Sequence, residues 1–495
     1  MKVVILSVPF SIPSNRLLAP ALLSGCLNAA GIPSIGLDLN FSLGKHLKHK
    51  VWQSDLRSLS TLTNAYKNPM PMSANVYVLR FLINYLKDIR EKYNPEWIGL
   101  SLFTLHSLLL TRLVIRLVRK YLPDSKIVLG GRMLELQFEG KCWYDIYDAE
   151  SLVDLIIVGD AEISLVDAIK HDRRGLIKSP QQTQEDLDNI PFPNWAGYGE
   201  FPLKGTDQFI PITGSKGCVR HCTFCDVAAF WPKYIYRDGT KIADTIISNH
   251  RATGITDFRF TDNLINGSIS HFRKMNERIV ELLPNTIKYS GQAIFRSKKS
   301  TPEADFELAA AAGCELLLLG LESGSEKVRN DMKKKFSNDD LEYSAGQYYK
   351  NKIKQIWLFI VGYPTETEED FQDTLRLIKN FAPMSREGLV FISVTHPFLL
   401  LPGSPLTTDP VISEQFHFSL DPAIDSPLLT HFWESSDENT FPLRVDRWRR
   451  FYQTVVDNGC QFSPKMDVSY SLRQLDAYER LYKENVRKYI PILKA

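Results

Sequence analysis

The chain lacks a long apolar run and a strong net charge. Its longest apolar stretch, about residues 98–118, is interrupted by His106, Arg112 and Arg116, so we expect no membrane-spanning helix. The formal net charge is only +2 over 495 residues, which gives no electrostatic case for binding nucleic acid. The sequence also shows no phosphate-binding loop, no glycine-rich dinucleotide motif and no Ser-His-Asp hydrolase pattern. Common nucleotide-binding and hydrolase classes are therefore disfavoured.

Cysteines are few, and most are scattered. Four of the seven lie far apart, which is not a disulfide framework, and we expect them to be small buried side chains in a reducing cytoplasm: Cys26, Cys142, Cys314 and Cys460. The apolar start at residues 3–8 predicts a buried strand and not a signal peptide. Two basic runs are interpreted as solvated helix faces: Lys45/Lys48/Lys50 and Lys333-Lys334-Lys335.

The other three cysteines lie together, at Cys218, Cys222 and Cys225. Three thiolates on one short loop can bind three irons of a [4Fe–4S] cluster and leave the fourth iron open. A structural zinc ion requires a closed set of four ligands, and His221 would have to bend back to complete it. The spacing therefore favours a cluster with an open iron. A zinc-binding interaction protein is the alternative from a different class.

The first part of the chain alternates short apolar runs with amphipathic segments. We predict strands at 3–8, 34–38, 97–102, 126–129 and 155–158, and helices at 17–30, 77–93, 107–121 and 161–170. Buried strands separated by helices indicate a parallel sheet with right-handed crossovers. Residues 1–175 are therefore predicted to form a flavodoxin-like or Rossmann-like α/β domain.

A second alternation follows a polar segment, residues 176–205, that we interpret as a linker. Strands are predicted at 209–213, 257–261, 288–294, 315–320, 355–361 and 389–394, with helices between them. Six such units over residues 206–405 indicate a partial (β/α)6 TIM-type barrel, whose chemistry is expected at the carboxyl ends of the strands. Residues 406–495 are predicted to be a mostly helical C-terminal domain or cap, with helices at 444–458 and 472–489.

The cysteine spacing, Phe224 and the position after the first barrel strand resemble the radical S-adenosylmethionine (SAM) enzymes. The resemblance implies that the open iron binds the amino and carboxylate groups of SAM. One electron from the cluster then cleaves SAM to methionine and a 5′-deoxyadenosyl radical, which abstracts a hydrogen atom from the substrate.

Further segments in the same order are similar to the SAM-binding motifs of that family. The resemblance implies that Asp262 lies near the SAM amino group and that Gln292 and Arg296 follow the third strand, where Arg296 pairs with the carboxylate. A surface arginine is the alternative for Arg296. In Gly320-Leu321-Glu322-Ser323-Gly324, the resemblance implies hydrogen bonds between the ribose and the side chains of Glu322 and Ser323. In Gly362-Tyr363-Pro364-Thr365-Glu366 it implies that backbone near Gly362 faces the adenine.

An α/β domain ahead of such a barrel resembles the cobalamin-binding subgroup. The resemblance implies cobalamin contacts at the carboxyl ends of the strands: Pro9, Asp38, Ser101, Leu102, Gly130, Gly131, Gly159 and Glu162. The loop from Pro9 to Arg16 has no His, so the Asp-x-His-x-x-Gly motif is missing. Either cobalamin binds without a protein His ligand, or the domain is a scaffold. Methylthiotransferases are excluded because only Cys26 and Cys142 precede the barrel.

The combined prediction is a cobalamin-dependent radical SAM methyltransferase acting at an unactivated carbon. It implies a small-molecule or peptide substrate and an external one-electron reductant of the flavodoxin or ferredoxin type. A non-methylating cyclase or a ring-rearranging enzyme is the alternative. No catalytic side chain is assigned, and candidate substrate contacts in the barrel-top loops and C-terminal region are Trp231, His396, Trp433 and Trp448.

Overall fold

The computed structural model describes most of the chain, and its contacts divide it into two compact units. Unit 1 is made mainly of Met1–Ile212, and unit 2 mainly of Thr213–Ile247 and the chain from Phe258 onward. The described residues are 2–9, 17–43, 46, 75–102, 105–135, 137–138, 141–149, 151–198, 208–394, 396–401, 403–415, 419–420, 433–434 and 439–464, with short pieces between 466 and 483. Across these residues, every helix is too short or too polar to cross a membrane.

Unit 1 is built on a six-stranded parallel sheet in the order β2-β1-β3-β4-β7-β8. The strands are β1 (Val3–Ser7), β2 (Ser34–Leu37), β3 (Trp97–Ser101), β4 (Lys126–Gly130), β7 (Leu155–Val158) and β8 (Gly175–Lys178). The first five follow the strand order of flavodoxin-like folds. The predicted fold class of this part is confirmed, and a sixth strand, β8, is added to it.

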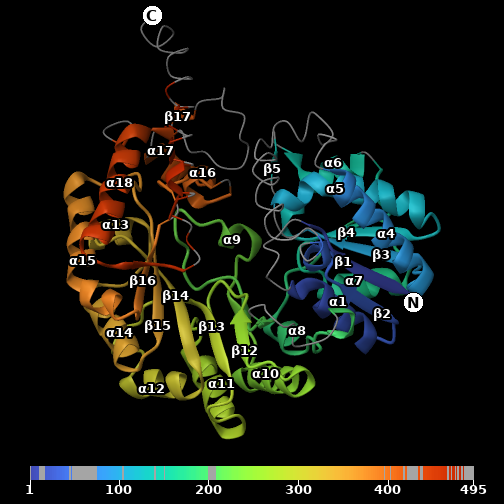
Figure 1. Cartoon of the computed structure of the whole chain (residues 1–495), viewed down its shortest axis with the longest axis horizontal. Coiled ribbons are helices and arrows are strands. Elements are labelled where there is room, and N and C mark those ends of the chain that lie inside the picture. Colours follow the sequence, from blue (N-terminus) through green and yellow to red (C-terminus); the bar gives the residue numbers. More distant parts are fainter. Residues whose placement is uncertain are drawn as a thin grey trace, which may run out of the picture. The chain divides into compact units, whose positions relative to one another are not determined.

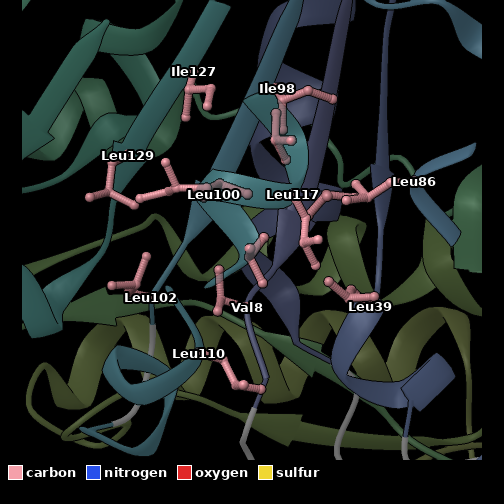
Figure 2. Close-up of a cluster of buried hydrophobic side chains, with 14 of the residues drawn as sticks. Val8, Leu39, Leu86, Ile98, Leu100, Leu102, Leu110, Leu117, Ile127 and Leu129 are labelled. Carbon is pink, nitrogen blue, oxygen red and sulfur yellow. The ribbon is translucent and has the colours of Figure 1, made fainter. Parts of the chain in front are cut away.

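Helices cover both faces of this sheet. Successive strand residues point to opposite faces, and apolar side chains on both faces are buried under helices. Val4 and Leu6 belong to a cluster with α4 (Asn75–Tyr93) and α5 (Leu105–Tyr121), whereas Val3 and Ile5 pack with residues of α1 (Leu18–Ala29) and α7 (Ala161–Lys170). Figure 2 shows part of the first cluster, with Ile98 and Leu100 of β3 near Ile127 and Leu129 of β4. The remaining elements are η1 (Arg132–Glu135), β5 (Gln137–Phe138), β6 (Lys141–Cys142) and α6 (Trp143–Ala149).

Residues 176–198, expected to begin a linker, are instead packed onto unit 1. They include β8, α8 (Gln184–Asp188) and η2 (Ala196–Tyr198). The Asn194 N–H donates to the Ala21 carbonyl at 2.8 Å, and the Tyr198 hydroxyl donates to the Leu17 carbonyl at 2.5 Å. Leu187, Ile190, Trp195 and Tyr198 of this segment are also buried. These few apolar residues are spaced too irregularly among polar ones to give a periodicity signal.

Unit 2 contains a seven-stranded sheet in the order β19-β16-β15-β14-β13-β12-β9. Its strands are β9 (Ile210–Ile212), β12 (Asp257–Phe260), β13 (Lys288–Ala293), β14 (Cys314–Glu322), β15 (Lys354–Phe359), β16 (Val390–Ser393) and β19 (Gln461–Phe462). The six predicted strands are present. The seventh, β19, corrects the expectation of a separate C-terminal region, since it pairs with β16. Two residues are too few for a periodicity signal.

Helices cover one face of this sheet and leave the other more open. They are α10 (Gly239–Thr253), α11 (Ile269–Leu282), α12 (Glu303–Ala311), α14 (Asn338–Lys350) and α15 (Glu368–Arg386), and Figure 1 shows α11, α12, α14 and α15 outside the strands. Val328 of α13 (Glu326–Asp331) packs instead in a cluster with Tyr363 and Phe398. Tyr289, Leu317 and Trp357 are buried on the covered face. On the other face Gln292 is exposed and Leu318 is only partly buried. This second face is the concave side expected of a partial barrel.

The C-terminal part of unit 2 is attached to the barrel through α18 (Phe441–Asp457). Arg450 of α18 makes two hydrogen bonds to the Glu368 carboxylate at the start of α15, at 2.7 and 3.0 Å. The other elements are α16 (Pro405–Thr408), α17 (Pro410–Gln415) and the antiparallel pair of β17 (Ser419–Leu420) and β18 (Trp433–Glu434). The helix predicted at 472–489 lies largely outside the described residues.

Candidate active site

The three grouped cysteines lie on the loop that follows the first barrel strand. β9 ends at Ile212, and β10 (Ser215–Lys216) pairs with β11 (Ile235–Tyr236) before and after the loop, which α9 (Val227–Phe230) follows. Gly217 has φ +76°, and a Cβ atom there would lie 2.7 Å from the Lys233 carbonyl oxygen. The turn into the cysteines therefore requires glycine. The loop leaves the carboxyl end of its strand, where barrel chemistry is found.

The donor set fits a cluster better than a single closed metal ion. The Cys222 thiol is buried, and burial raises its pKa to about 12, while Cys218 and Cys225 are partly exposed. The Arg220 N–H donates to the Cys218 sulfur at 3.4 Å. Throughout the described ranges, no three Cys, His, Asp or Glu side chains are grouped closely enough to hold one ion. A closed zinc site would need a fourth ligand beside the three thiolates, whereas in a [4Fe–4S] cluster each of three thiolates would bind its own iron.

A buried ion pair lies beside the cysteine loop. Lys334 Nζ is 2.8 Å from Glu322 Oε1, and the two side chains are only 8% and 9% exposed. The ammonium lies 5.7 Å from the centroid of the Phe224 ring. Burial opposes the charge of Lys334, but Glu322 and the nearby Cys222 thiol outweigh it and raise the lysine pKa above its usual 10.5. Lys334 supplies the positive charge that an anionic cluster or a carboxylate ligand would need.

Lys334 corrects the interpretation of Lys333-Lys334-Lys335 as a solvated helix face. Lys333 and Lys335 are exposed as expected, but Lys334 between them is buried. Both exposed lysines have left-handed backbone, with φ +59° and +55°, and Glu322 has φ +70°. This backbone path turns the middle side chain inward. No feature of the sequence distinguishes Lys334 from Lys333 and Lys335, so its burial could not be predicted from the sequence.

Glu322 and Ser323, the predicted ribose ligands, are both buried and already hydrogen-bonded. Glu322 pairs with Lys334, which is the partner that a buried carboxylate requires. Gly320 makes room for this pair, since a Cβ atom there would lie 2.4 Å from Glu322 Oε1 and 2.6 Å from Lys334 Nζ. The Ser323 hydroxyl lies 3.3 Å from that of Thr374 and accepts the Ser325 N–H at 3.1 Å. Their role toward SAM stays a prediction.

Asp262 is enclosed beneath the start of the cysteine loop. Its carboxylate accepts the Gly214 N–H at 2.9 and 3.1 Å and the Ser215 hydroxyl at 2.7 Å. Burial raises the Asp262 pKa to about 7, against these hydrogen bonds. The observed contacts make Asp262 a support for the backbone that enters the loop, in addition to the predicted contact with the SAM amino group.

Gln292 and Arg296 lie near each other in sequence but in different surroundings. Gln292 is exposed on the concave face of β13. Arg296 is not a free surface arginine, because its Nη2 donates to the carbonyls of Asn266 and Gly267. Its Nε is buried without a hydrogen-bond partner among the described residues. Arg296 thus retains one donor for a ligand such as the predicted carboxylate.

Both backbone hydrogen-bonding groups of Gly362 already have partners within the protein. Its N–H donates to Glu366 Oε2 at 2.8 Å, and its carbonyl accepts the Asn439 side-chain amide at 3.2 Å. A Cβ atom at Gly362, where φ is +86°, would lie 2.4 Å from Arg444 Cγ. The close approach of Arg444 of α18 therefore explains the glycine, and an adenine contact stays a prediction.

The candidate substrate residues separate into core and accessible positions. Trp433 and Trp448 are fully buried and belong to the core. His396 is exposed, and its ring Nδ1 lies 3.0 Å from the Pro397 carbonyl oxygen. Trp231 is partly exposed, at the end of α9. Of the four, His396 and Trp231 are the positions accessible for contact with a bound molecule.

In unit 1, the predicted cobalamin residues share one edge of the sheet. They follow adjacent parallel strands, at the carboxyl ends where ligands of such sheets bind. Asp38 is buried and accepts hydrogen bonds from the Ser7 hydroxyl and the Phe41 N–H. Gly131 has φ +117°, and a Cβ atom there would lie 2.2 Å from the Leu102 carbonyl oxygen. Close approach of the protein's own backbone thus explains Gly131 without a ligand.

The remaining predicted cobalamin residues differ in solvent exposure. Pro9 and Leu102 are buried, Ser101 and Gly130 are partly exposed, and Gly159 is exposed. Glu162 is buried and accepts the Gln182 side-chain amide at 3.1 Å. Gly130 and Gly159 are the positions of this set at which backbone is open to a ligand.

Part of the barrel is similar to a described protein superfamily. Residues 212–378 match the radical SAM superfamily. The chain is 20% identical over 362 residues to cytidylyl-2-hydroxyethylphosphonate methyltransferase of Streptomyces wedmorensis, covering 63% of this chain and 66% of that protein. It is 24% identical over 287 residues to anaerobic magnesium-protoporphyrin IX monomethyl ester cyclase of Synechocystis, covering 54% and 56%. The chain thus spans between half and two thirds of the length of these relatives.

Solved structures share the fold of both units. The methyltransferase TsrM of Kitasatospora setae, solved with cobalamin and a [4Fe-4S] cluster, aligns with TM-score 0.60 and 17% identity over 84% of this chain and 78% of its own. OxsB, a cobalamin-dependent SAM radical enzyme, aligns with TM-score 0.62 and 13% identity over 98% and 71%. The predicted two-part fold and the resemblance to radical SAM proteins with an N-terminal α/β domain are confirmed.

Proposed function

We propose that this chain, which carries a radical SAM domain, is a cobalamin-dependent radical SAM methyltransferase that acts at an unactivated carbon. The observation that carries the proposal is the set of three thiols on one loop at the carboxyl end of β9, with the Glu322–Lys334 pair beside it. The names of the methyltransferase relative and of TsrM support the methyl transfer. The fold shared with TsrM and OxsB supports cobalamin as the second cofactor.

In this proposal each part of the chain has a role. Residues 1–175 would hold cobalamin, residues 206–405 the cluster and SAM, and residues 406–495 would complete the barrel. Cys218, Cys222 and Cys225 would bind three irons, and Lys334 and the free donor of Arg296 would attract the SAM carboxylate. When bound, the cluster, SAM and cobalamin would supply the radical and methyl-transfer chemistry, and the protein would orient them. A flavodoxin- or ferredoxin-type reductant would supply the electron.

Anaerobic reconstitution with iron, sulfide and hydroxocobalamin tests the proposal directly. We expect about four irons and about one cobalt per chain after desalting. Cys222→Ala should lose the cluster, whereas the matched control Cys460→Ala should retain it, since Cys460 lies away from the loop near the Ile378 carbonyl. Iron without cobalt would contradict the cobalamin part alone. Zinc without iron would contradict the whole proposal.

A non-methylating radical SAM cyclase is the second candidate, favoured by the cyclase relative. The two are separated by products. A methyltransferase forms S-adenosylhomocysteine together with a methylated product, and a cyclase forms neither from its substrate.

A further inference from the structure

The cysteine loop is fastened at Thr223, between its second and third cysteines. The Thr223 N–H donates to the Met332 carbonyl at 3.3 Å, and the Thr223 carbonyl accepts the Leu406 N–H at 2.9 Å. Its hydroxyl lies 2.7 Å from the hydroxyl of Tyr363. Thr223 is buried, so its hydrogen bonds are shielded from water. The Thr223 hydroxyl also lies 3.5 Å from the Asp331 carbonyl oxygen. The position of Cys222, one residue earlier, therefore depends on these four partners.

Tyr363 is the partner that connects the loop to a distant part of the sequence. Its side chain is fully buried, and its ring packs against Phe398 at a centroid distance of 5.6 Å. Its hydroxyl lies 3.5 Å from the Asp331 carbonyl in addition to Thr223. Tyr363 follows β15, so one side chain spans from the fifth barrel strand to the cysteine loop.

The backbone of Tyr363 is held by the segment that leads into α18. The Asn439 side-chain amide donates to the Tyr363 carbonyl at 2.7 Å and to the Gly362 carbonyl at 3.2 Å. Arg444 of α18 in turn donates to the Asn439 carbonyl at 2.8 Å and to the Trp433 carbonyl at 2.6 Å. Its guanidinium lies 3.7 Å from the centroid of the Trp433 ring. These residues are buried, so the contacts form a rigid support.

We infer that the C-terminal segment positions the cysteine loop through the chain Arg444, Asn439, Tyr363 and Thr223. This inference rests on the proposed function only in taking the loop as the cluster site. Tyr363 and Asn439 are positioning residues, because they act on Cys222 through the backbone of the neighbouring Thr223. The C-terminal segment, here Asn439 together with Arg444 of α18, thereby helps to form the cluster site of the barrel.

Tyr363→Phe tests the link, because it removes one hydroxyl and keeps the ring. We expect iron to leave the reconstituted protein for a chelator about three- to tenfold faster, the effect of losing one buried hydrogen bond. The control is Tyr343→Phe, which removes a 2.9 Å hydrogen bond to the Thr301 carbonyl elsewhere in unit 2. It should leave the rate within about twofold. Equal rates for Tyr363→Phe and the wild type would overturn the inference.

Thr223→Val and Asn439→Ala test the two ends of the chain of contacts. If Thr223 and Tyr363 act through their shared hydrogen bond, the double variant releases iron no faster than either single variant. Asn439→Ala should speed release in the wild type and add little in the Tyr363→Phe background. Fully additive effects would contradict a shared route.

Alkylation of the metal-free protein separates this inference from the proposed function. The Cys222 thiol is 8% exposed, and Tyr363→Phe should increase its alkylation rate by iodoacetamide, read by mass spectrometry, while Tyr343→Phe should not. A wild type that holds no iron but shows this difference would contradict the proposed function and support the positioning link. Unchanged alkylation of Cys222 in a wild type that does hold iron would overturn the link alone.

Discussion

The buried ion pair of Glu322 and Lys334 gives the sharpest prediction, through Lys334→Met. Methionine has a similar length and no charge, so the change leaves the Glu322 carboxylate buried without its partner at 2.8 Å. Removing one member of a buried pair costs about 3–5 kcal/mol, because an uncompensated charge remains. The control is Lys335→Met, since Lys335 is adjacent, exposed and also has positive φ. A change there should stay within about 0.5 kcal/mol.

The assay is urea unfolding of the metal-free protein at pH 7, so that loss of a cluster does not contribute. A second substitution, Glu322→Gln, should recover part of the loss in the Lys334→Met background, because it removes the stranded charge. The coupling between the two sites should reach about 1 kcal/mol or more, as expected for residues in contact. If Lys334→Met and Lys335→Met have equal unfolding free energies, Lys334 is not the buried partner of Glu322 and the reasoning fails.

The pH dependence of the pair follows from the raised pKa of Lys334. A lysine whose pKa is raised on folding contributes stability that is complete below its ordinary value of 10.5. That contribution is lost as the pH rises through the folded-state value. Wild type and Lys334→Met should therefore become more alike in stability only above about pH 10.5.

Three further predictions concern the same unit. Gly320→Ala should destabilise the protein by about 1–3 kcal/mol in urea unfolding, because its Cβ atom would meet Glu322 and Lys334. The control Gly346→Ala lies in open space on α14 and should be neutral or stabilising by up to about 1 kcal/mol. Equal losses of stability in the two variants would contradict the steric clash at residue 320. Because burial raises the Asp262 pKa to about 7, wild-type stability should fall relative to Asp262→Asn as the pH rises from about 4 to 7; parallel curves would refute an enclosed carboxyl. Hydrogen bonding to Arg450 lowers the Glu368 pKa to about 2, so Arg450→Met should move its titration, followed by NMR, toward 4.5, and an unmoved titration would remove Arg450 as the cause.

The sequence alone determined the local features of this protein. The cysteine loop was readable because its residues are neighbours in the chain, so their spacing by itself predicts a cluster site. The strands were readable because burial on a sheet imposes runs of apolar residues, and the α/β alternation then implies parallel pairing. The observed strands Val3–Ser7 and Leu155–Val158 and the observed helix Ala161–Lys170 accordingly end within a residue or two of the predicted 3–8, 155–158 and 161–170.

Only the tertiary structure decided which charged and polar residues turn inward. Lys334 and Lys335 are adjacent lysines with nearly the same neighbours in the sequence. Lys334 is buried because the residues on both sides of it have left-handed backbone, and because Gly320 has no side chain to fill the space that the Glu322–Lys334 pair occupies. β19 pairs with β16 through backbone groups, and the Asn439 side-chain amide donates to the Tyr363 backbone carbonyl; each contact joins segments about 70 residues or more apart. Every residue carries the backbone groups that these contacts use, so no side-chain pattern in β16 or at Tyr363 predicts them. Sequence thus specified the chemistry of the loop, and the fold specified what surrounds it.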